Sequence, residues 1–124
     1  MPLCIAAGGI VTALAIESFT LAWTHSIEKI RWEEDYRVEA TQLRLTEARV
    51  RGSGAGMEPP AGSRFEHGVW RYTPELPALP RLRLTQSTYA TGYELCHDGR
   101  CEALTRYAKA AESGDVIELM PCTP

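Results

Sequence analysis

A chain of 124 residues is long enough for one domain with a modest core, and its composition of 44% hydrophobic and 23% charged residues is that of an ordinary globular protein. The formal net charge is −3, and the basic residues are dispersed among acids rather than clustered. Nucleic acids and anionic membrane surfaces are therefore poor partners, because both require a basic patch. We expect a single β domain over residues 1–124.

The N-terminal residues 3–16 form an almost uncharged stretch. It is too short for a transmembrane helix, which needs about 20 apolar residues. It resembles the apolar part of a secretory signal, with residues 20–22 as a cleavage site, but no Lys or Arg precedes it and Gly8-Gly9 interrupts it. We interpret it instead as two buried strands joined by a Gly-Gly turn.

Residues 19–25 alternate cleanly, with one face formed by Phe19, Leu21, Trp23 and His25. Residues 32–39 alternate again, and residues 42–50 repeat the pattern with Leu43 and Leu45. These last two segments predict a hairpin that turns at residues 40–41.

The longest predicted loop follows, because Gly52, Gly54 and Gly56 precede Pro59-Pro60. Residues 64–72 predict another hairpin, turning at His67-Gly68. Three prolines between residues 74 and 80 indicate an irregular connection.

Strand patterns resume at residues 82–84, 93–96 and from 101 onward, and residues 116–120 predict the last strand. One short helix is predicted at residues 105–113, ending at Gly114. Frequent turns between short strands favour an all-β fold, either a small β-sandwich or an open barrel of eight to ten strands.

The four cysteines predict two disulfides. Cys96 and Cys101 flank an Asp-Gly turn, so they face each other across a hairpin. Cys4 and Cys122 lie in the first and last predicted strands, and a bond between them would tie the chain ends. Two disulfides imply an oxidising compartment, such as the periplasm. Free thiols remain an alternative, as does a soft-metal site at Cys96, His97 and Cys101.

The densest group of functional side chains lies at residues 23–34. His25 with Glu28 or Glu33 has the ligand types of a metal site, although a satisfied structural histidine is the simpler interpretation. His25 beside Ser26 raises the alternative of a small hydrolase. However, adjacent strand residues point to opposite faces, and no oxyanion hole is identifiable. The glycine-rich loop offers amides to an anion, but it lacks the Lys-Ser/Thr and the helix of a P-loop.

Several stretches of the chain resemble an uncharacterised bacterial family, domain of unknown function 1850. They are FTLAWTHSIEK at 19–29, WEEDY at 32–36, EARVRGSGAGMEPP at 47–60, LCHDGRC at 95–101 and MPC at 120–122. Genes of this family are often found beside those of TRAP-type transporters of the TAXI class. The resemblance therefore implies a periplasmic or otherwise extracytoplasmic accessory role, and no enzymatic activity is assigned to the family.

The leading hypothesis is a non-enzymatic domain that binds a small solute or a transporter component, with no cofactor and no transmembrane segment in this chain. A metal-binding protein is the alternative, and a small hydrolase the second. The candidate binding surface joins the bend after the third strand to the glycine-rich loop: His25, Ser26, Glu28, Lys29, Trp32, Glu33, Gly54, Gly56 and Met57.

Overall fold

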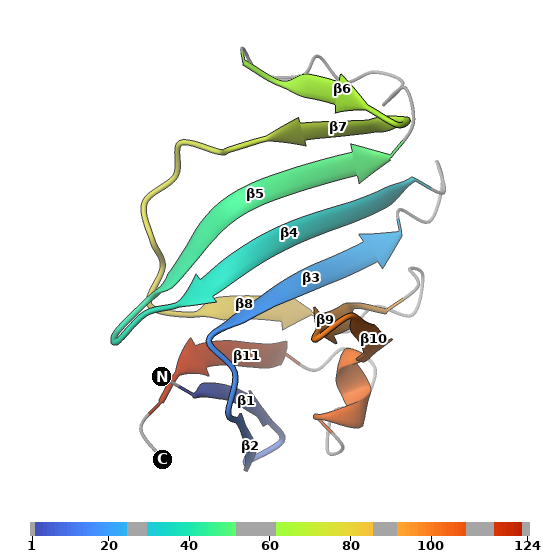
Figure 1. Ribbon diagram of the computed structural model, residues 1–124. Coiled ribbons are helices and arrows are strands. Elements are labelled where there is room, and N and C mark those ends of the chain that lie inside the picture. The colour runs from blue at the N-terminus through green and yellow to red at the C-terminus, as the bar shows by residue number, and fades with distance from the viewer. Residues whose placement is uncertain (1, 25–29, 52–61, 86–91, 109–115, 123–124) are drawn as a thin grey trace.

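The computed structural model describes residues 2–24, 30–51, 62–85, 92–108 and 116–122 (Figure 1). Over these residues the chain forms eleven strands in two antiparallel sheets. The smaller sheet has the order β2-β1-β11-β8, and the larger has the order β10-β9-β3-β4-β5-β7-β6. The strands are β1 (Leu3–Ala7), β2 (Ile10–Leu14), β3 (Ser18–Thr24), β4 (Arg31–Val38), β5 (Leu43–Arg51), β6 (Arg64–Glu66), β7 (Val69–Tyr72), β8 (Leu82–Thr85), β9 (Glu94–His97), β10 (Arg100–Ala103) and β11 (Val116–Pro121).

The predicted turns are confirmed, and their backbone explains why these sequences form them. Gly8-Gly9, His67-Gly68 and Asp98-Gly99 each have positive φ at both residues. Two consecutive positive φ values characterise the two-residue turn whose twist matches that of paired strands. The remaining predicted hairpin, which turns at residues 40–41, closes where the Glu39 N–H donates to the Gln42 carbonyl at 2.9 Å.

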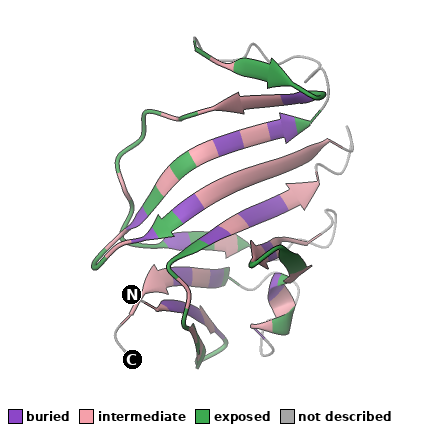
Figure 2. Cartoon of the chain, viewed as in Figure 1, coloured by how far each residue is buried: buried purple, intermediate pink, exposed green. Residues whose placement is uncertain are grey.

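The main core lies between the two sheets (Figure 2). Leu3 and Ile5 of β1 and Ile117 and Leu119 of β11 are fully buried, and they form one cluster with residues of β3, β4, β5, β8 and β9. The described residues include no buried polar or charged side chain. The core is therefore made by apolar side chains that alternate along the strands, as the sequence pattern predicts.

The two ends of the chain meet in the smaller sheet. Strand β1 pairs with both β2 and β11, so it is a central strand. Cys4 forms a disulfide with Cys122, and the Cys122 N–H donates to the Pro2 carbonyl. The N-terminal stretch forms two strands, as interpreted, but only β1 is buried; β2 lies at the edge of the sheet and is largely exposed, so the expectation that both strands are buried is wrong. Within the described ranges no helix is long and apolar enough to cross a membrane.

Three expectations need correction. The fold has eleven described strands rather than eight to ten, and they form two separate sheets, so the barrel alternative is wrong. The predicted helix is also wrong: residues 104–106 make a single 3-10 turn, and residues 109–113 lie outside the described part. Leu104 explains the difference, because its N–H bonds to the Tyr93 carbonyl and its side chain is fully buried in the core.

A β-bulge in β5 was not predicted. Tyr36 pairs with Leu45 but Asp35 pairs with Glu47, so Thr46 is an extra residue between them. One extra residue reverses the alternation of everything that follows it. As a result, Ala48 and Val50 face the same side of the sheet as Leu43 and Leu45, and the charged residues of β5 face the other side.

Candidate functional site

Only two of the proposed binding residues, Trp32 and Glu33, are described by the structure. They are neighbours on β4 and point to opposite faces of the larger sheet. His25, Ser26, Glu28, Lys29, Gly54, Gly56 and Met57 lie outside the described residues. The strand residues next to these segments are Thr24, Arg31 and Arg51, which end or begin their strands at the same end of the sheet.

At this end, the inner face of the sheet carries a row of large side chains. The cross-strand partners run without a break through Trp23, Trp32, Val50, Trp70 and Phe65. The indole rings of Trp23 and Trp32 stack with centroids 6.3 Å apart, and Phe65 and Trp70 lie 4.9 Å apart. We call this the aromatic row. It spans β3, β4, β5, β7 and β6, and in Figure 1 its β7–β6 end extends beyond the smaller sheet.

Glu34 lies in the middle of the next row on the same face. Its cross-strand neighbours are Leu21 and Ala48, and the row ends in Leu95 and Tyr72. The row after that consists of Phe19, Tyr36 and Leu45. Glu34 is thus the one charged side chain in three rows of apolar and aromatic residues. Among the described residues its one hydrogen bond comes from the Tyr36 hydroxyl at 2.9 Å, and no described basic side chain forms an ion pair with it.

The electrostatics of this face follow from its low polarity. Burial raises the pKa of Glu34, and the hydrogen bond from Tyr36 only partly offsets this effect. Burial and the nearby Glu34 carboxylate raise the pKa of Tyr36, Tyr72 and Tyr93. The Glu34 carboxylate therefore contributes to the raised pKa of three tyrosines. No described cation lies beside it to favour its ionised form.

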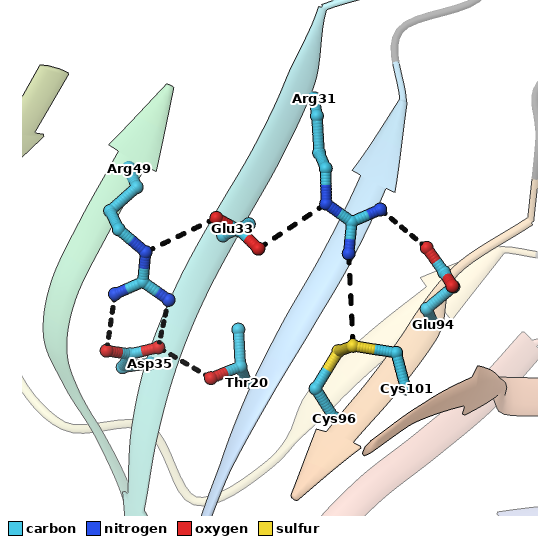
Figure 3. Close-up of a disulfide and its surroundings, with 8 residues drawn as sticks. All are labelled: Thr20, Arg31, Glu33, Asp35, Arg49, Glu94, Cys96 and Cys101. Carbon is cyan, nitrogen blue, oxygen red and sulfur yellow. Dashed lines mark hydrogen bonds and ion pairs between the residues drawn. A yellow bond between two sulfur atoms is a disulfide. The ribbon is translucent and has the colours of Figure 1, made fainter. Parts of the chain in front are cut away.

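The outer face of the same strands is entirely different (Figure 3). Arg49 makes two hydrogen bonds to Asp35, at 2.6 and 2.7 Å, and a third to Glu33. Arg31 connects the other oxygen of Glu33 to Glu94 of β9, which it contacts at 2.6 Å. This ladder of alternating charges crosses β9, β4 and β5. Its acids are all matched by arginines, so we assign it a structural role.

The pKa of Asp35 agrees with that assignment. Burial alone would raise it, but the hydrogen bonds from Arg49 and from the Thr20 hydroxyl outweigh burial and hold the pKa below its usual value. The hydrogen bonds that Arg49 donates to Asp35 in turn raise the pKa of Arg49. Glu34 and Asp35, adjacent in sequence, are thus shifted in opposite directions because only Asp35 faces the arginines.

A groove of about 880 Å³ lies beside this ladder on the outer face. It is lined by Thr20, Asp35 and the β9–β10 hairpin, including Cys96, His97 and Cys101. Cys96 and Cys101 are joined in a disulfide, as predicted, so neither sulfur is a thiolate in this form. His97 contacts Asp98 at 3.1 Å within the turn. The described residues contain no group of three or more potential metal ligands.

The feature that sequence reasoning missed is Glu34 with the aromatic row. A signal was present, because Trp32, Glu34 and Tyr36 alternate and must share one face. Trp70 and Phe65 could not be joined to them from the sequence, because their place depends on the pairing of β5 with β7 and of β7 with β6.

Comparison with known proteins gives a family but no characterised relative. No curated protein and no solved structure matches the chain. Residues 19–104, which run from β3 to the 3-10 turn and include the aromatic row, Glu34 and the charge ladder, match a family described as domain of unknown function (DUF1850). The match covers more than half of the chain, and the protein therefore belongs to the DUF1850 family.

Proposed function

We propose that this protein is a non-enzymatic, extracytoplasmic binding domain that recognises a positively charged protein partner on the inner face of its larger sheet. The observation that carries the proposal is Glu34, a carboxylate without a described cationic partner, among aromatic side chains on one face. We further propose that the partner is a component of a TAXI-class TRAP transporter.

The size and chemistry of the face support a protein partner. Four spacings between five strands make the aromatic row about 19 Å long, which is the scale of an interface rather than of a small solute. Phe65 is 54% exposed, and the other aromatic side chains of the row are partly exposed. Large aromatic residues are the commonest energetic centres of protein interfaces.

The charge of the face supports a basic group on that partner. A carboxylate in apolar surroundings is costly when it is unpaired, and a guanidinium or ammonium group that approaches it removes that cost. The same cation gains further from the faces of neighbouring Trp and Tyr rings. The described acids of the charge ladder on the outer face offer no comparable site, because they already contact Arg31 and Arg49.

The two disulfides support the compartment. Both are formed, and the described part of the chain contains no free cysteine. Disulfides persist in oxidising compartments and are rare in the cytosol.

The test uses the full chain, tagged and expressed in its native host, with cell fractionation followed by affinity capture and identification of the transporter subunits. We expect the wild-type protein outside the cytoplasm, with a TAXI transporter component retained. E34K should abolish that retention, because it places a positive charge where the partner's cation binds. R64Q is the control, since Arg64 is exposed and, among the described residues, forms an ion pair with Glu66 alone.

Two results would overturn the proposal. One is capture of no transporter component together with normal solute uptake in a deletion strain. The other is equal retention by E34K and R64Q, with both variants folded by circular dichroism, which would remove the inner face from the interaction.

A further inference from the structure

The two disulfides occupy very different surroundings. Cys4 is only 7% exposed, in a central strand of the smaller sheet, and the N–H of its partner Cys122 donates to the Pro2 carbonyl at 3.1 Å. Cys96 and Cys101 instead join β9 to β10, which is the edge strand of the larger sheet. Both of these cysteines line the outer groove, and Cys101 is exposed.

A positive charge lies next to the exposed disulfide. The Nη2 atom of Arg31 is 4.0 Å from the Cys101 sulfur (Figure 3). Arg31 is held there from two sides, by Glu94 at 2.6 Å and by Glu33 at 3.4 Å. A cation beside a sulfur favours its thiolate form, and a more stable thiolate is a better leaving group in disulfide exchange.

We propose that Cys96–Cys101 is a thiol-exchange site that opens on reaction with a dithiol while Cys4–Cys122 stays closed. A thiolate of the dithiol enters through the groove and attacks the Cys96 sulfur. A mixed disulfide forms there, and the Cys101 sulfur leaves with the electron pair as a thiolate beside Arg31. The second thiol of the dithiol then attacks the dithiol sulfur that is bonded to Cys96, which closes the dithiol's own disulfide and releases the Cys96 sulfur as a thiolate. The protein gains two electrons and two protons, and the dithiol becomes a disulfide.

The pairing of the strands around Cys96 and Cys101 does not depend on their disulfide. Residues 94–96 of β9 pair with residues 20–22 of β3. Leu95, in the middle of this pairing, is fully buried. The β9–β10 turn keeps its Asp98-Gly99 geometry without help from the bond, because that turn is favoured by sequence. Opening therefore exposes two thiols at the groove without releasing either sheet.

The experiment treats the native full-length protein with increasing dithiothreitol near neutral pH, traps thiols with N-ethylmaleimide and locates them by peptide mass spectrometry. We expect Cys96 and Cys101 to be labelled while Cys4 and Cys122 remain bonded and the tryptophan fluorescence stays native. Simultaneous labelling of all four cysteines would overturn the proposal.

The role of Arg31 has its own test in the rate of opening. R31Q should slow the labelling of Cys96 and Cys101 about threefold and raise the pH midpoint of their ultraviolet thiolate absorbance, because the leaving thiolate loses its nearby charge. R31K should restore most of both effects. The matched control is R44Q, which removes an arginine paired with Glu39 on the same face. Equal rates and equal midpoints for R31Q and R44Q would refute the assistance by Arg31.

Discussion

Removing either disulfide should destabilise the protein, but by very different amounts. The perturbation is a pair of double variants, C4A/C122A and C96A/C101A. The bonds join residues separated by 118 and 5 positions, respectively. A bond that closes a longer loop removes more conformational freedom from the unfolded chain. The chain-entropy relation gives about 5 kcal/mol for the end-to-end bond and about 2 kcal/mol for the hairpin bond.

The larger loss is comparable with the whole stability of many domains, which is about 5–15 kcal/mol. C4A/C122A should therefore be close to unfolding at physiological temperature, whereas C96A/C101A should remain folded. The assay is equilibrium unfolding in guanidinium chloride at pH 7, followed by tryptophan fluorescence. The slope with denaturant should also increase in C4A/C122A, because an unfolded chain without the long-range bond exposes more surface. The reasoning is refuted if the two variants lose equal free energy, or if the hairpin variant loses more.

Three further substitutions test individual contacts. D35N should lower the free energy of unfolding by about 1.5 kcal/mol at pH 7, as expected for hydrogen bonds between charged groups at a half-buried site. Because the folded-state pKa of Asp35 is lowered, the wild type should lose this advantage as pH falls below about 4. Chemical denaturation of both proteins at pH 7 and pH 3 is the test, and a difference between them that does not change with pH would contradict the role of the pair. E34Q should raise the melting temperature at neutral pH. Since the folded-state pKa of Glu34 is raised, wild-type stability should decline as pH rises from about 4 through that pKa. An E34Q melting temperature below the wild-type value would contradict the assignment. G99A should lower the free energy of unfolding by about 1 kcal/mol in chemical denaturation. The cause is backbone strain, because φ is +76° at Gly99 and no atom lies within 4 Å of the added methyl group. G99N should cost less, and an unchanged stability of G99A would disprove the strain.

Local chemistry determined most of the fold. Gly8-Gly9, His67-Gly68 and Asp98-Gly99 specify their turns through residues that tolerate positive φ. Alternation along β3 and β4 determines which side chains enter the core, and the position of Cys96 and Cys101 on either side of a two-residue turn determines their pairing. These features depend on neighbours within a few residues, so the sequence contains all the information that is needed.

The candidate site depends on contacts between residues that are far apart in the sequence. The bulge at Thr46 turns Ala48 and Val50 to the inner face. Without it, Glu47 would lie opposite Glu34 and Arg49 would share that face, so Glu34 would lose its apolar neighbours. The 3-10 turn likewise replaces a helix because Leu104 fits the core of two distant sheets.

By itself, the sequence predicted an all-β chain with two disulfides, one of which ties its termini together, and the structure contains both bonds. Only the tertiary structure decided that five strands bring Trp23, Trp32, Trp70 and Phe65 into one row beside Glu34, and that Asp35 faces the arginines instead. The physical reason is that alternation assigns a residue to a face, whereas the pairing and register of distant strands decide which residues share that face as neighbours.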